Sequence, residues 1–218
     1  MIFRDATPAV CIALILTGLA GCKLIKNASE GGDGEMVSGK SGGNMTALVD
    51  EIWDARVLPH MRDSATDLAT LGPAIEADLD AAGEAHGYRP SSEGSPWNFA
   101  VSVKGEIVSA KTDTRAATAD VDVNGDGEAD AVLQLGPVIR GTTLRDVLPF
   151  IDFTSFTDQI EFAQLSRALN TKAYETALEG LPRESLVGQP VEALGAFTVR
   201  GKGDAILITP VEMKLVRQ

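Results

Sequence analysis

The sequence has few of the residues that build disulfide frameworks and zinc sites. Among 218 residues there are two cysteines, Cys11 and Cys22, and two histidines, His60 and His86. These four candidate ligands are scattered and show none of the paired spacings of zinc modules. The scarcity excludes a disulfide-stapled fold and a Cys/His zinc centre.

Basic residues are also in short supply. Lysine and arginine total 19 against 31 acidic residues, a formal net charge of −12. A chain with this balance repels phosphate backbones, so nucleic acid is not expected as a partner. The hydrophobic share of 44% is nevertheless that of a globular protein with a core, not that of a disordered chain.

No uncharged run near the N-terminus reaches the roughly 20 residues of a membrane-spanning helix. The run from Ala6 to Gly21 has 16 residues and follows Arg4, a pattern typical of a signal peptide. It ends in Leu19-Ala20-Gly21-Cys22, which resembles the lipobox of bacterial lipoproteins. The resemblance implies cleavage after residue 21, acylation of Cys22 and a lipid anchor that holds the chain to the membrane, facing the periplasm. A plain secretory peptide with a chance cysteine is the alternative.

The residue after Cys22 bears on the choice of membrane. Lys23 stands where enteric lipoproteins that stay in the inner membrane carry Asp, so resemblance to that sorting habit favours the outer membrane.

The rest of the chain divides into three parts by pattern. Residues 22–46 are polar and glycine-rich, which predicts a flexible linker. Residues 47–90 have apolar residues at helical spacing, broken at Gly72-Pro73, and predict a helical subdomain. Residues 91–218 predict an α/β barrel-like subdomain. Its expected strands lie at 97–103, 107–110 with a turn at Gly105, 117–123, 131–135, 197–199 and 205–215, and its helix at 160–180.

An acidic loop lies between two of these strands. Asp122, Asn124, Asp126 and Asp130 occupy positions one, three, five and nine of a loop with Gly127 at position six, and the backbone near Glu128 supplies a further oxygen. Calcium prefers such oxygen ligands, and the spacing resembles the strand-loop-strand sites of integrin-type propellers. The pattern predicts a structural calcium site at Asp122, Asn124, Asp126, Glu128 and Asp130. A bare hairpin turn is the alternative, because Asn-Gly and Asp-Gly favour turns on their own.

Several segments resemble a bacterial family of predicted periplasmic lipoproteins, domain of unknown function 2291. The most specific is Gln134 to Ala163. The others are Trp53, Val57-Leu58-Pro59, Tyr88-Arg89, Pro96-Trp97-Asn98-Phe99 and Ile208-Thr209-Pro210-Val211. The resemblance implies an α+β fold: a small N-terminal helical subdomain followed by an α/β subdomain with a small OB-like β-barrel. It brings no assigned activity, and it suggests a link to sugar-type ABC importers.

The family-like segment also holds a polar cluster, Arg140, Thr142, Arg145 and Asp146. Two arginines and free N–H groups at a helix start could bind an anion or sugar hydroxyls. The favoured interpretation is structural, with Thr142 as the helix cap and an arginine paired with Asp146 or Glu161.

Three function classes follow. A non-catalytic, lipid-tethered binding or accessory module is favoured, because no nucleophile elbow, metal triad or paired-histidine motif is present. A scaffold for envelope assembly and an envelope enzyme are the alternatives.

Overall fold

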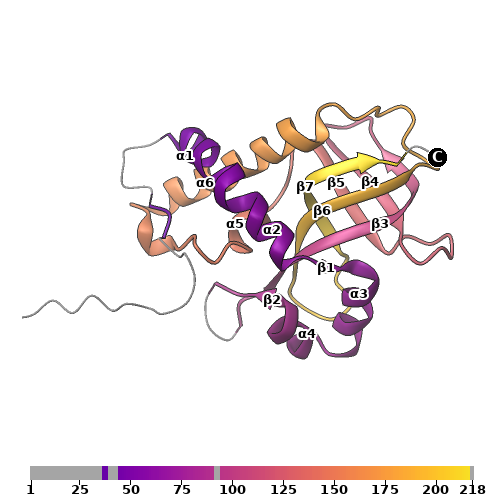
Figure 1. Cartoon of the computed structure of the whole chain (residues 1–218), viewed down its shortest axis with the longest axis horizontal. Coiled ribbons are helices and arrows are strands. Elements are labelled where there is room, and N and C mark those ends of the chain that lie inside the picture. The colour runs from indigo at the N-terminus through magenta and orange to yellow at the C-terminus, as the bar shows by residue number, and fades with distance from the viewer. Residues whose placement is uncertain (1–35, 39–43, 91–93, 217–218) are drawn as a thin grey trace, which may run out of the picture. The chain divides into compact units, whose positions relative to one another are not determined.

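The computed structural model describes residues 36–38, 44–90 and 94–216, and residues Gly34–Gln218 form one compact unit, called the head below (Figure 1). The helices are α1 (Met45–Ile52), the π-helix η1 (Trp53–Val57), α2 (Leu58–Ser64), α3 (Leu68–Ala77), α4 (Leu79–His86), α5 (Thr143–Asp146), the 3₁₀ turn η2 (Phe153–Ser155), α6 (Gln159–Ala173) and the π-helix η3 (Tyr174–Leu178). The strands are β1 (Thr66–Asp67), β2 (Gly87–Tyr88), β3 (Trp97–Lys111), β4 (Ala116–Asp122), β5 (Ala131–Pro137), β6 (Pro190–Val199) and β7 (Leu207–Leu215).

Five strands close into a barrel. Their order is β3-β4-β5-β7-β6, and β6 pairs back onto β3. All neighbours are antiparallel except β5 and β7, which are parallel. The helical segment from α5 to η3 connects β5 with β6, and the short strands β1 and β2 add to β3. The predicted α+β fold with a small OB-like barrel is therefore confirmed.

The turn predicted at Gly105 is wrong, because β3 runs without interruption from Trp97 to Lys111. The strand pairs with β6 over Trp97–Glu106 and with β4 over Glu106–Lys111, so it changes partner at Glu106, directly after Gly105. A Cβ built on Gly105 would lie 2.2 Å from the carbonyl oxygen of Asp122. The glycine thus permits a close backbone approach in a bent barrel strand, where the sequence pattern alone favours a turn.

The helix break predicted at Gly72-Pro73 is also wrong. Helix α3 continues through Pro73, and its ends are set by aspartates. The Asp67 side chain accepts from the N–H of Ala69, and Asp78 both ends α3 and caps α4. Asp is among the strongest N-cap residues, so the caps outweigh the hydrogen bond that an internal proline removes.

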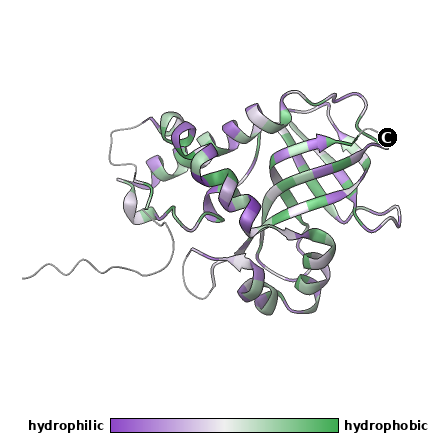
Figure 2. Ribbon diagram, viewed as in Figure 1, coloured by the Kyte–Doolittle hydropathy of each residue, from purple (hydrophilic) through white to green (hydrophobic). Residues whose placement is uncertain are grey.

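Successive side chains on the barrel strands point alternately into two hydrophobic cores. Inward side chains such as Val101, Leu133 and Phe197 fill the barrel, and α3 and α4 contribute to the same core. Outward side chains on β3, β6 and β7, including Ala100 and Ala196, join a second core with α1, η1, α2, α5 and α6. Figure 2 shows the apolar residues of the barrel strands and of the helices beside them in green. The helices of residues 45–86 thus belong to two cores, and neither core ends at residue 90.

The head begins earlier in the chain than the predicted linker end at residue 46. Val37 is buried and its N–H donates to the carbonyl of Phe150 at 3.0 Å. Helix α1 begins at Met45 because the Asn44 side chain caps it, accepting from the N–H groups of Thr46 and Ala47.

Candidate functional site

The acidic loop between β4 and β5 is closed by hydrogen bonds from its own backbone. The two carboxylate oxygens of Asp122 accept from the N–H groups of Gly125 at 2.6 Å and Gly127 at 2.7 Å. Both glycines have positive φ, 83° and 87°, which turns their N–H groups inward at no steric cost. These two bonds, that of Gly125 first, lower the pKa of the Asp122 carboxyl, which stays ionised at neutral pH.

The other loop residues form a chain of similar turns. Asn124 accepts from the N–H of Asp126 at 2.9 Å, and Asp126 accepts from the N–H of Glu128 at 2.8 Å. Asp130 closes the loop, accepting from the N–H of Val123 at 2.7 Å and from the Asn124 amide at 3.0 Å. Within the described residues, no group of three or more His, Cys, Asp or Glu side chains is placed to share a metal ion. Calcium binding by this loop stays a prediction.

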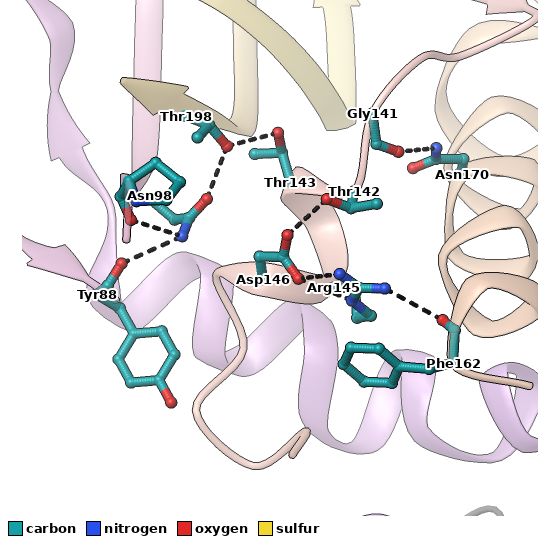
Figure 3. A network of polar contacts seen from close by, with 11 residues as sticks. Tyr88, Asn98, Gly141, Thr142, Thr143, Arg145, Asp146, Phe162, Asn170 and Thr198 are labelled. Atoms are coloured by element: carbon teal, nitrogen blue, oxygen red, sulfur yellow. Dashed lines mark hydrogen bonds and ion pairs between the residues drawn. The ribbon is translucent and has the colours of Figure 1, made fainter. Parts of the chain in front are cut away.

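The structure brings Thr142, Arg145 and Asp146 together at α5 (Figure 3). The Arg145 guanidinium contacts the Asp146 carboxylate through Nε at 2.7 Å and Nη2 at 2.6 Å. It also donates to the carbonyl of Phe162 at 3.3 Å and lies over the ring of that residue, 3.7 Å from its centroid. The pair with Asp146 is one that the sequence favoured, and the contacts with Phe162, which connect α5 to α6, are an addition from the structure.

Thr142 does not cap the helix as predicted. Its side chain accepts no helix N–H; its hydroxyl donates to Asp146 at 2.5 Å. With Arg145 on one oxygen and Thr142 on the other, the Asp146 carboxylate is held from two sides.

Arg140 is not part of this network. Its side chain is exposed, and it forms no ion pair or hydrogen bond with any described residue. Its backbone is fixed instead, because the Gln134 side chain accepts from its N–H at 2.8 Å and donates to its carbonyl at 3.1 Å. The guanidinium group therefore stays available at the surface.

A second polar chain, which sequence reasoning missed, lies beside α5. The Thr198 hydroxyl donates to the Asn98 side chain at 2.7 Å and lies 2.8 Å from the Thr143 hydroxyl (Figure 3). Asn98 also donates to the carbonyl of Tyr88 at 3.3 Å, although only 1% of Asn98 is exposed. The chain joins β2, β3, β6 and α5. Its members are far apart in the sequence. Tyr88, Asn98 and Thr143 lie in family-like segments, but no local pattern predicts that they meet.

Part of the outer barrel wall, on β3, β4, β5 and β7, is not covered by the helices and carries a row of solvent-facing side chains. Strand register places Ser109 opposite Asp120, Asp120 opposite Val132, and Val132 opposite Leu207. Lys111 and Thr118 form a neighbouring pair. We call these six residues the barrel face: Ser109, Lys111, Thr118, Asp120, Val132 and Leu207. The Ser109 hydroxyl donates to Asp120, and every member is at least partly exposed.

Comparison with known proteins identifies the family. A family model described as a predicted periplasmic lipoprotein, domain of unknown function 2291, matches residues 12–214. The chain belongs to this family. The matched range contains Cys22, the loop at 122–130 and the cluster at 140–146. No curated protein matches the chain.

A solved structure of an OB-fold protein from Thermotoga maritima resembles this lipoprotein. The TM-score is 0.64 at 17% sequence identity, with 80% of this chain and 99% of that chain covered. At this identity the likeness supports the fold alone, and it agrees with the barrel order given above.

Cys22, the predicted lipid attachment site, lies outside the described residues. The family description supports an envelope protein associated with the membrane through a lipid anchor. Within the described residues, no helix has both the length and the apolar character needed to cross a bilayer.

Proposed function

We propose that this lipoprotein is a non-catalytic binding or accessory module, held at the envelope by acylated Cys22 and linked to sugar-type ABC import. The barrel face carries the proposal. It presents hydroxyl, carboxylate and ammonium groups next to two apolar side chains, a mixture suited to sugar hydroxyls and their apolar ring faces.

Fold analogy points to the same surface. Barrels of this type bind oligosaccharides or oligonucleotides on the wall formed by their second and third strands, here β4 and β5. The net charge of −12 opposes oligonucleotides. Because a fold does not fix a function, the barrel face requires a direct test.

Site-specific crosslinking provides that test. A photoreactive residue at Thr118 of the full acylated chain, irradiated in native membranes, is expected to capture an importer component. The same residue at Val187, which is 59% exposed and lies outside the barrel face, is the control. Capture of envelope-assembly proteins from Thr118 would support the scaffold alternative. Equal crosslinked products from both sites would contradict the barrel face as the binding surface.

The anchor is tested separately. Cys22→Ser is expected to leave an uncut, unacylated precursor, because acylation of the thiol precedes cleavage in lipoproteins. Mass spectrometry of the N-terminus and flotation with vesicles measure the two steps. Membrane retention of the variant at mature size would contradict a lipid anchor on Cys22. An outer-membrane destination, which Lys23 favours, is checked by separating the two membranes.

We also propose that calcium stabilises the loop at 122–130. Asp126→Asn keeps an oxygen that can accept from the N–H of Glu128 and removes only the charge, so it separates metal binding from turn formation. Isothermal titration of the full chain with calcium should give heat in the wild type and in Asp113→Asn, an acidic residue outside the loop, and none in Asp126→Asn. Absence of heat in the wild type would leave a bare turn.

A further inference from the structure

Three exposed apolar side chains occur in the first described residues of the head, 36–38, and in the segment that leads from Ile151 into α6. Met36 is 41% exposed, Phe153 is 44% exposed and Ile160 is 66% exposed. No other large apolar side chain among the described residues is as exposed as Ile160. We call these three residues the entry patch.

Residues 37 and 38 contact the turn that precedes α6. Val37 forms a parallel bridge with Ile151, and the Ser38 hydroxyl donates to the carbonyl of Ser155 at 3.1 Å. Figure 1 shows the described residues 36–38 next to this turn. Phe153 begins the turn at η2, inside the segment that residues 37 and 38 contact, and Ile160 follows this segment as the second residue of α6.

The Phe153 ring packs against a neighbouring aromatic ring. It packs edge-on against the ring of Phe162, with 5.4 Å between centroids, and Phe162 also contacts Phe156 at 5.3 Å. Phe156 is buried and Phe162 carries the Arg145 guanidinium on its face. The partly exposed Phe153 ring therefore packs on aromatic residues of the head.

We infer that the entry patch rests on the lipid surface to which the chain is anchored. The inference depends on the proposed acylation of Cys22. Thirteen residues separate Cys22 from Met36, so the patch can lie no further than about 50 Å from the lipid-bearing residue, whatever the path of the chain. An attachment of this length gives an effective concentration in the millimolar range, at which a small apolar contact becomes populated.

The charges near the entry patch indicate which lipids it prefers. Asp152, Asp158 and Glu161 flank it, and each accepts a backbone N–H, from Thr154, Ile160 and Thr157 respectively. These carboxylates would be repelled by an anionic surface. The contact is therefore apolar, and it should be stronger on zwitterionic lipids than on anionic ones.

Nitroxide labels on single cysteines test the inference. Acylation blocks Cys22 and cleavage removes Cys11, so an introduced cysteine is the one free thiol of the mature chain. Phe153→Cys and Ile160→Cys are labelled in the full acylated protein, reconstituted in phosphatidylcholine vesicles. Val187→Cys is the control, because it is similarly exposed and follows the opposite end of the α6–η3 helix, which rises about 30 Å from Gln159 to Leu178.

Collisions with oxygen and with a water-soluble nickel chelate report the surroundings of each label. We expect a several-fold higher ratio of oxygen to nickel collisions at 153 and 160 than at 187, decreasing when phosphatidylglycerol is added. Use of two sites guards against local disturbance of the Phe153 packing. Vesicle-bound protein with equal ratios at all three sites would overturn the inference and leave the anchor intact. Failure to bind vesicles at all would overturn both.

Discussion

Single residues decide where the barrel backbone can approach itself, and Gly105 is the clearest case. Its missing Cβ leaves room for the carbonyl of Asp122, at 2.2 Å from the position a Cβ would take. Gly72 in α3 is the opposite case, because a Cβ there would meet nothing within 4 Å beyond its chain neighbours and the backbone of its own helix, and its φ is not positive.

These two glycines make a matched pair for mutation. Gly105→Ala is expected to lower the free energy of unfolding by about 2–3 kcal/mol, since either β3 or β4 must shift. Gly72→Ala is expected to raise it by about 0.5–1 kcal/mol, through better helix propensity. Urea unfolding measures both. A neutral Gly105→Ala would mean that the two strands lie further apart than described.

The Asp122 carboxylate makes loop stability depend on pH. Backbone hydrogen bonds hold its folded pKa below the value near 4 of an unfolded aspartate. Its contribution is therefore fully present above the unfolded pKa and is lost as the pH falls through the folded pKa.

Asp122→Asn tests this dependence, because it removes the titration and keeps an amide oxygen as acceptor. The wild type should exceed the variant in urea midpoint at pH 7, and the gap should shrink as the pH falls below about 4. A gap that stays constant with pH would show that the charge does not stabilise the loop.

At the scale of elements, α5 depends on its attachment to α6. Only four residues long, α5 is too short to be stable on its own. Arg145 supplies the attachment through Asp146, the carbonyl of Phe162 and the ring of Phe162. The Arg145 side chain is 13% exposed, so water does little to weaken these contacts.

Arg145→Lys retains the charge and loses the planar fork and the stacking. It is expected to cost about 1–2 kcal/mol of unfolding free energy, measured by urea denaturation. Arg140→Lys is the control and should change stability by less than about 0.5 kcal/mol, because the Arg140 side chain is exposed and unpaired with any described residue. Equal effects of the two substitutions would argue against the role given to Arg145.

At the scale of the whole head, the two cores share strands. β3 gives Ala100 to the core with α1 and α6 and gives Val101 to the barrel interior, and β6 divides its residues in the same way with Ala196 and Phe197. Because loss of either core disrupts the same strands, the head is expected to unfold in one cooperative transition.

Its two tryptophans report the cores separately. Trp53 is 2% exposed in the first core, and Trp97 packs against the second. In Trp97→Phe the remaining fluorescence follows Trp53, and in Trp53→Phe it follows Trp97. Within each variant the fluorescence midpoint in urea should coincide with the midpoint from circular dichroism. Separate midpoints would instead support independent folding units divided near residue 90.

The sequence determined much of the local structure and the family. Alternating apolar residues predicted the strands around 117–123 and 131–135, helical spacing predicted α6, and the family resemblance supplied the barrel. The segment from Gln134 to Ala163 was the most specific of several segments that resembled this family. These properties follow from short-range patterns, because the spacing of apolar residues and the residues that favour turns can be recognised within a short stretch of sequence.

Tertiary structure decided what depends on distant partners. Whether Gly105 forms a turn or a close approach depends on the carbonyl of Asp122 on the neighbouring strand β4. Arg140 and Arg145 have different roles, because the Arg145 guanidinium lies over the Phe162 ring whereas the Arg140 side chain is exposed to solvent. The row of Ser109, Asp120 and Val132 exists only through strand register. A linear sequence lists these residues, but closure of the barrel and packing of the helices determine which of them meet.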